Sequence, residues 1–189
     1  NRQANIKLND VVAIMGAGPI GLMHIQLARL AGAKRVIVFE PILHRRELAV
    51  KMGADLALDP READPVEVVL KETGGLGADA CILAIGVPEL VNTGLRLLRK
   101  GGVIDLFAGF SGKGELTLEA NLIHYNEISI KGATACTRSQ YKSALDLIAS
   151  RKVNARELIS HTYPLERFNE ALDTVIQGRG VKVVITPWD

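Results

Sequence analysis

The sequence has 189 residues, 48% of them hydrophobic and 4% aromatic, which allows a sizeable core in one domain or in one domain with an appendage. Its 23 basic and 21 acidic residues give a formal net charge of +2 and are scattered without a run, which argues against a nucleic-acid partner. The two cysteines, Cys81 and Cys136, are far apart in sequence. We therefore expect two reduced thiols in a cytoplasmic protein, and neither a disulfide framework nor a metal knuckle.

One segment, residues 11–33, is apolar enough to be tested as a membrane span. Glycines and Pro19 interrupt it, and His24, Gln26 and Arg29 punctuate it. A buried strand that runs into a buried helix explains the segment better, so we expect no membrane association and see no targeting segment.

Apolar segments of strand length alternate with segments of helical periodicity along most of the chain. Strands are predicted at residues 11–15, 35–39, 56–58, 80–85, 102–107 and 128–132. Helices are predicted at 20–30, 45–52, 65–72, 89–98 and 141–149, where apolar residues recur at three- and four-residue spacing. This alternation predicts an α/β fold with a doubly wound, parallel, six-stranded sheet.

The C-terminal part has a different character. Two predicted strands, residues 158–165 and 181–186, flank a predicted helix at 167–177, and they need not join the first sheet. We therefore divide the chain into a nucleotide-binding domain, residues 1–135, and a C-terminal segment, residues 136–189.

The clearest motif is Gly16-Ala17-Gly18-Pro19-Ile20-Gly21, between the first strand and the first helix. In such a loop, the first glycine permits a tight turn, the second lets the backbone approach a pyrophosphate, and the third lets helix and strand pack closely. Glu40 follows Gly21 by 19 residues, at the end of the second strand, where a carboxylate can accept both hydroxyls of an adenosine ribose. Together these features predict a dinucleotide site.

The same carboxylate favours NAD over NADP. Glu40 would repel a 2′-phosphate, and the next three residues are uncharged. Arg45 and Arg46 weaken this inference, because either guanidinium could turn toward a phosphate or stack on the adenine. For Arg46, a solvated position on a helix is an equally good interpretation.

With these motifs in order, the sequence resembles the zinc-type medium-chain dehydrogenases, in particular the sorbitol and related polyol dehydrogenases. The resemblance covers nearly the whole chain and implies a Rossmann fold. The matching segments are residues 11–21, Lys51-Met52-Gly53-Ala54-Asp55, Gly101-Gly102-Val103, residues 127–132 and Ile159-Ser160-His161-Thr162-Tyr163-Pro164-Leu165.

The resemblance also implies a role for each part of the site. The glycine loop would bind the pyrophosphate, with Lys182 neutralising it, while Glu40 would hold the adenosine ribose and Arg45 would flank the adenine. Segments after the fourth, fifth and sixth strands would line the nicotinamide ribose and ring, although Phe107 is equally well interpreted as a core aromatic. The implied cofactor-binding residues are Gly16, Gly18, Pro19, Ile20, Gly21, Glu40, Arg45, Ile85, Gly86, Phe107, Ala108, Gly109, Ala133, Thr134 and Lys182.

Two departures from the family bear on activity. Ala135-Cys136 replaces the Arg-Tyr pair that meets the polyol in animal sorbitol dehydrogenases, so sorbitol is not assumed; Arg138 would either replace that contact or cap a helix. In the family, the zinc ligands and the proton relay belong to an N-terminal domain that would precede Asn1. The C-terminal segment would return to that catalytic domain, and we expect these 189 residues to be inactive alone.

No metal site or general base is predicted within the chain itself. The four histidines belong to separate elements, and none stands at ligand spacing from a cysteine or a carboxylate. We therefore name no catalytic residue here, and expect zinc only in the absent domain. The histidines are His24, His44, His124 and His161.

Three other functions remain open. A zinc-free quinone reductase would usually prefer NADP and lack the Pro-Ile step of the loop, and Glu40 argues against it. A methyltransferase also has a glycine-rich first loop but needs no third glycine for a pyrophosphate, and a non-catalytic NAD sensor would have no reason to carry the dehydrogenase tail. The resemblance further implies a homodimer or homotetramer, with residues 115–118 as the edge strand that pairs with its copy.

Overall fold

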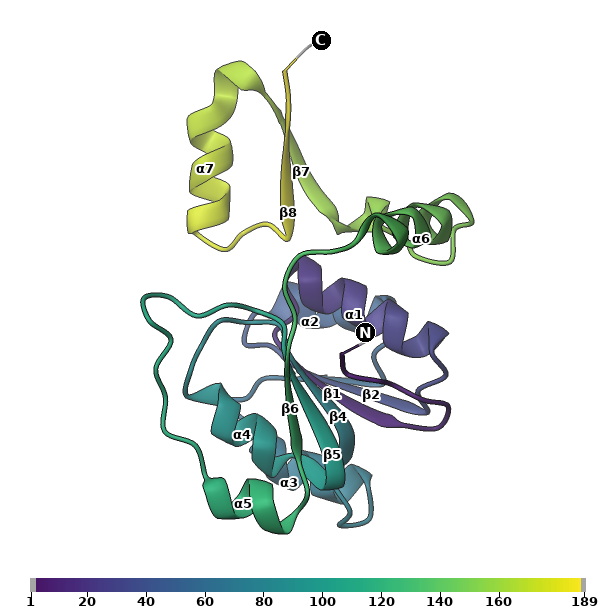
Figure 1. Cartoon of the computed structure of the whole chain (residues 1–189). Coiled ribbons are helices and arrows are strands. Elements are labelled where there is room, and N and C mark those ends of the chain that lie inside the picture. Colours follow the sequence, from purple (N-terminus) through teal and green to yellow (C-terminus); the bar gives the residue numbers. More distant parts are fainter. Residues whose placement is uncertain (1–2, 188–189) are drawn as a thin grey trace. The chain divides into compact units, whose positions relative to one another are not determined.

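The computed structural model describes residues 3–187, and the chain forms two compact units (Figure 1). The first unit ends at Arg138 and the second begins at Ser139. Within residues 3–187, no helix has both the length and the apolar character needed to cross a membrane.

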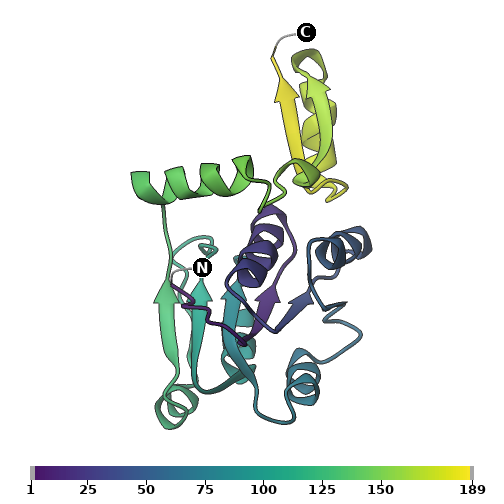
Figure 2. The same cartoon turned by 90° about the vertical axis from the view of Figure 1, so that its right-hand side faces the viewer.

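The first unit is built on a six-stranded sheet in the order β3-β2-β1-β4-β5-β6. All neighbouring strands are parallel, so their carboxyl ends meet at one edge, which the arrowheads mark in Figure 2. The predicted doubly wound fold is therefore confirmed. The strands are β1 (Val11–Met15), β2 (Arg35–Phe39), β3 (Leu56–Leu58), β4 (Ala78–Leu83), β5 (Leu98–Leu106) and β6 (Ser129–Gly132).

Helices cover both faces of this sheet. Figure 1 shows α1 (Pro19–Leu30) and α2 (Leu43–Lys51) on one face, and the remaining three helices of the unit on the other. β1 and, after Arg35, β2 are buried runs of apolar residues, as expected for a parallel sheet with two covered faces, whereas the short β3 is only partly buried. The helices of the second face are α3 (Pro65–Glu72), α4 (Leu90–Arg96) and α5 (Ala120–Tyr125).

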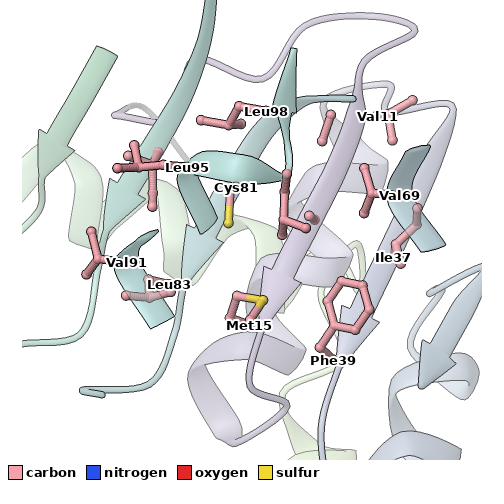
Figure 3. Close-up of a cluster of buried hydrophobic side chains, with 14 of the residues drawn as sticks. Val11, Met15, Ile37, Phe39, Val69, Cys81, Leu83, Val91, Leu95 and Leu98 are labelled. Carbon is pink, nitrogen blue, oxygen red and sulfur yellow. The ribbon is translucent and has the colours of Figure 1, made fainter. Parts of the chain in front are cut away.

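A continuous apolar cluster fills the space between the sheet and the second helical layer (Figure 3). Alternate residues of the central strands point into it, because successive side chains of a strand face opposite sides. Val69 of α3 and Leu95 of α4 meet them from the helices, and neither side chain is exposed. The strand residues labelled in the figure are Val11, Met15, Ile37, Phe39, Cys81, Leu83 and Leu98.

Some strand and helix boundaries differ from those predicted from the sequence. β4 and β5 begin earlier than predicted, at Ala78 and Leu98, because an irregularity in their register between Ala78 and Ala80 lets the chain before the Gly101 turn pair with β4. Helix α5 was not predicted, because six residues give too short a periodic pattern to recognise.

The predicted edge strand at residues 115–118 is unpaired chain in this structure. The Asn92 side chain holds it at one end, donating to the Thr117 carbonyl oxygen at 2.8 Å and accepting from the Glu119 N–H at 3.3 Å. Pairing of this segment with a second copy stays a prediction.

The second unit contains a separate two-stranded parallel sheet of β7 (Ile159–Pro164) and β8 (Lys182–Thr186). Helix α7 (Phe168–Ile176) connects the two strands, and Tyr163 of β7 hydrogen-bonds Thr174 of α7 at 2.9 Å between hydroxyl oxygens. Helix α6 (Arg138–Ala149) precedes this group.

Candidate functional site

The glycine-rich turn lies between β1 and α1, at the carboxyl edge of the sheet. Gly16 has φ of +95°, in the region that favours glycine, and a Cβ on Gly21 would overlap the Gly16 carbonyl oxygen. A Cβ on Gly18 would meet no atom within 4 Å. The fold itself therefore requires glycine at position 16, for the tight turn, and at position 21, for the close backbone contact. Gly18 instead leaves open space over the turn.

Helix α1 starts directly from this turn. Pro19 occupies its first position, where the missing N–H costs nothing, and the first intrahelical bond runs from the Leu22 N–H to the Gly18 carbonyl at 3.0 Å. The N–H groups of Ile20 and Gly21 precede that bond, and so face the open end of the helix. Such an end binds anions through its free N–H groups and its partial positive charge.

Glu40 follows β2 and is bonded to the glycine turn. Its side chain is nearly buried; one carboxylate oxygen accepts from the Ala17 N–H at 2.8 Å and the other from the Ile42 N–H at 3.0 Å. A carboxylate offers about four acceptor positions, so roughly two remain for further donors. The arrangement fixes an acidic acceptor beside the open space over Gly18.

The turn lies at the point where the strand order reverses. β1 and β4 are neighbours, whereas the chain continues from them toward opposite sides of the sheet, and ligands of such sheets bind in the crevice at that point. Ile85, after β4, is the nearest side chain to the space that a Cβ on Gly16 would fill. A Cβ on Gly86 would overlap the Gly109 carbonyl oxygen, so the loops after β4 and β5 pack backbone to backbone.

Beyond these loops, the structure forms a hollow of about 580 Å³ after β5 and β6. Four predicted site residues line this hollow. A fifth, Ala108, is tied to β4, because its N–H donates to the Leu83 carbonyl oxygen at 3.0 Å. No residue of the lining carries an ionisable side chain. The lining is Leu106, Phe107, Gly109, Gly132, Ala133, Thr134 and Ala135.

At the other end of the site, charged side chains gather after β2 and β3. Arg46 is not solvated on its helix, as one interpretation held: it is largely buried and donates to the carbonyl oxygens of Glu40 and Pro41, at 2.9 and 2.8 Å. The Asp59 carboxylate forms ion pairs with both Arg46 and Arg61. The sequence reasoning missed Asp59 and Arg61, although an aspartate directly after a parallel strand signals the ligand-binding edge. Arg45 is half-buried in the first turn of α2, which begins shortly after β2.

Besides Glu40 and Asp59, three more ionisable groups are buried in the described part of the first unit. His24 of α1 packs edge-to-face on Phe107, with ring centroids 4.5 Å apart, and burial lowers its pKa to about 4. Phe107 therefore packs on the helix and also lines the hollow. Burial raises the pKa of the Cys81 thiol to about 12, and it also raises that of Asp105 on β5.

The remaining predicted residue, Lys182, belongs to the second unit, where it begins β8 and is exposed. Arg138, at the start of α6, is exposed as well. Among residues 3–187, no group of three or more histidine, cysteine, aspartate or glutamate side chains is arranged to hold a metal ion. Both cysteines are free thiols.

Comparison with known proteins gives a consistent result. The sequence profile of the family described as zinc-binding dehydrogenase matches residues 19–150. L-threonine 3-dehydrogenase of Thermococcus kodakarensis is 36% identical, over 92% of this chain and 50% of that protein. D-arabitol-phosphate dehydrogenase of Enterococcus avium is 34% identical, over 97% of this chain and 52% of its own length.

A solved structure described as a zinc-binding dehydrogenase from Sinorhizobium meliloti, bound to NADP, superimposes with a TM-score of 0.89. It is 31% identical, and the match covers 97% of this chain and 54% of that one. The chain thus spans about half the length of the relatives it matches.

Proposed function

Because the chain belongs to the zinc-binding dehydrogenases, we propose that it is the NAD-binding half of an oxidoreductase that transfers hydride between a secondary alcohol, such as a polyol, and nicotinamide. One observation carries the proposal: the Glu40 carboxylate is bonded to the glycine turn at the switch point of the sheet, beside the open space over Gly18. A dinucleotide needs this combination of a ribose acceptor and an anion-binding helix end.

The residues fit the groups of such a cofactor in order. Glu40 would accept from the adenosine ribose, and the N–H groups of Ile20 and Gly21 would hold the pyrophosphate. The uncharged hollow after β5 and β6 would seat the nicotinamide riboside and exclude water from one face of the ring. When bound, NAD supplies the hydride acceptor, and the protein supplies position and electrostatics.

Among the described residues, no cluster of side chains is arranged as metal ligands. We propose that the zinc ligands and the proton relay lie in sequence outside these residues and that the second unit belongs with that catalytic part. We further propose that these 189 residues alone do not oxidise a polyol. Cytoplasmic location and a homodimer or homotetramer complete the proposal.

The preference for NAD rests on charge. Glu40 is acidic at the ribose position, and Arg46 is already engaged by two backbone carbonyls and Asp59. A zinc-free reductase that uses NADP is the disfavoured alternative, and NADP in the Sinorhizobium meliloti structure is a property of that protein.

Calorimetric titration of the chain tests the proposal. NAD is expected to bind more tightly than NADP, and Glu40→Ala to weaken NAD by ten- to a hundredfold, since hydrogen bonds to a charged group contribute roughly 1.5–3 kcal/mol. Glu47→Ala, which removes an exposed carboxylate of α2, is the control and should leave NAD affinity unchanged. Tighter binding of NADP, or equal effects of the two substitutions, would overturn the assignment.

A further inference from the structure

The end of β3 carries a nearly buried aspartate with two arginines bonded to it. The Asp59 side chain is 3% exposed, and its two oxygens accept from the Arg61 guanidinium at 2.9 and 2.6 Å. The Arg46 guanidinium lies 3.3 Å from the same carboxylate. Hydrogen bonds from the Arg61 side chain hold the pKa of Asp59 well below its usual range, so the carboxylate is charged at neutral pH.

This cluster adjoins the proposed ribose acceptor. Arg46 donates to the carbonyl oxygens of Glu40 and Pro41, and Arg61 donates to the Pro41 carbonyl at 2.9 Å. Both guanidiniums thus bind the backbone directly after β2, where arginines accommodate the 2′-phosphate of NADP in folds of this kind. Two arginines thus lie where a 2′-phosphate of NADP would bind, and the Asp59 carboxylate is bonded to both of them.

The balance of charge decides what these arginines can bind. Glu40 and Asp59 together offset the charges of Arg46 and Arg61, so these two arginines offer a doubly charged phosphate no surplus positive charge. Arginine N–H groups aligned with a carboxylate in two parallel bonds are also already paired. A 2′-hydroxyl needs only the acceptor that Glu40 supplies.

We propose that Asp59 is a positioning residue for cofactor choice: by binding Arg46 and Arg61 it keeps both guanidiniums from a 2′-phosphate and so reinforces the preference for NAD. The inference rests on the proposed function, because it places the adenosine ribose at Glu40. It adds a second determinant, 19 residues beyond the first and directly after a different strand.

The test compares two probes of the adenosine end alone, ADP-ribose and 2′-phospho-ADP-ribose, by calorimetry on the 189-residue chain. Asp59→Asn keeps the shape of the side chain and removes its charge. It is expected to raise the affinity for the 2′-phosphorylated probe by about five- to twentyfold, as one or two charge-assisted hydrogen bonds become available, and to change that for ADP-ribose less than twofold. Adding Arg46→Gln and Arg61→Gln should remove the gain.

Asp79→Asn is the matched control. Asp79 also binds an arginine, Arg99 at 2.5 Å, but it is the second residue of β4 and lies at the amino edge of the sheet. It should leave the ratio of the two affinities unchanged. Equal weakening of both probes by Asp59→Asn would show a merely structural role and overturn the inference, as would no change in the ratio.

A second variant covers the case in which Asp59→Asn fails to fold. Arg61 is 70% exposed, so Arg61→Gln should fold, and it leaves Asp59 with less positive charge around it. The 2′-phosphorylated probe should then bind about two- to fivefold more weakly, with ADP-ribose unchanged, since the site gains net negative charge. An unchanged ratio contradicts the inference, and so does a loss of more than about tenfold, which would mean that Arg61 already binds the 2′-phosphate directly. Failure of the unaltered chain to bind ADP-ribose refutes the proposed function instead.

Discussion

Asp105 provides a prediction about stability that is independent of the cofactor. It lies on β5, in register with Ile82 of β4 and Lys131 of β6, and its side chain is fully buried. Neither of its carboxylate oxygens has a hydrogen-bond partner among residues 3–187. Burial raises the pKa of this carboxyl above its ordinary value, because the charged form loses hydration.

The sign of the pH dependence follows from that shift. An acid whose pKa is higher in the folded chain than in the unfolded chain binds more protons when folded, so the free energy of unfolding falls as pH rises through the folded pKa. The contribution is neutral below the unfolded pKa, near 3.8, and fully unfavourable above the folded one. A buried polar group without a partner costs about 1–3 kcal/mol.

Asp105→Leu should therefore stabilise the chain at pH 7 by roughly 1–3 kcal/mol, which corresponds to a rise of about 3–9 °C in Tm for a domain of this size. Urea unfolding followed by circular dichroism between pH 4 and 8 measures the effect, which should shrink toward pH 4. As a control, Asp79→Asn should destabilise, because Asp79 accepts from the Val11 N–H at 2.7 Å and from Arg99. The reasoning is refuted if Asp105→Leu destabilises at pH 7, or if its effect is the same at every pH.

Two further predictions concern the glycine turn and association. Gly21→Ala should lower Tm and abolish NAD binding together, because its Cβ would overlap the Gly16 carbonyl and overpacking costs about 1–3 kcal/mol; Gly18→Ala should keep its Tm and lose NAD affinity by calorimetry, because its Cβ would fill the open space over the turn. A loss of Tm in Gly18→Ala would contradict this division. The unaltered chain should sediment as a dimer, and Thr117→Pro, which removes one exposed backbone donor from the 115–118 edge, should shift it toward monomer. Equal dimerisation of the two would exclude this segment as the interface.

The parts of the fold that could be predicted are those with short-range causes. β1, β2 and β3 were predicted residue for residue, since each is a short apolar run next to a turn. The glycine turn was also predictable, because steric overlap at Gly21 and the positive φ of Gly16 admit few other residues. β5 was predicted too short because Gly101-Gly102 reads as a break, whereas the strand pairs on both sides of it.

The parts that could not be predicted depend on contacts between distant segments. Asp59 and Arg46 are 13 residues apart and on different elements, so only the parallel pairing of β2 and β3 brings them together. Asp105 has no distinguishing pattern either. A doubly wound sheet has both faces covered, but the sequence does not show that the carboxylate of a polar strand residue lacks a hydrogen-bond partner there.

The chemistry along the carboxyl edge has a spatial order that the sequence order obscures. Acidic and basic groups lie after β2 and β3, free N–H groups lie after β1, and an uncharged hollow lies after β5 and β6. A dinucleotide carries a ribose diol, a pyrophosphate and a second riboside in that sequence. A mononucleotide or a methyl donor would use only one end of such a row. The hollow therefore favours the dinucleotide hypothesis over the methyltransferase alternative. Its lining residues Phe107 and Thr134 would contact a ligand only if that ligand extends past the glycine turn, as a dinucleotide does.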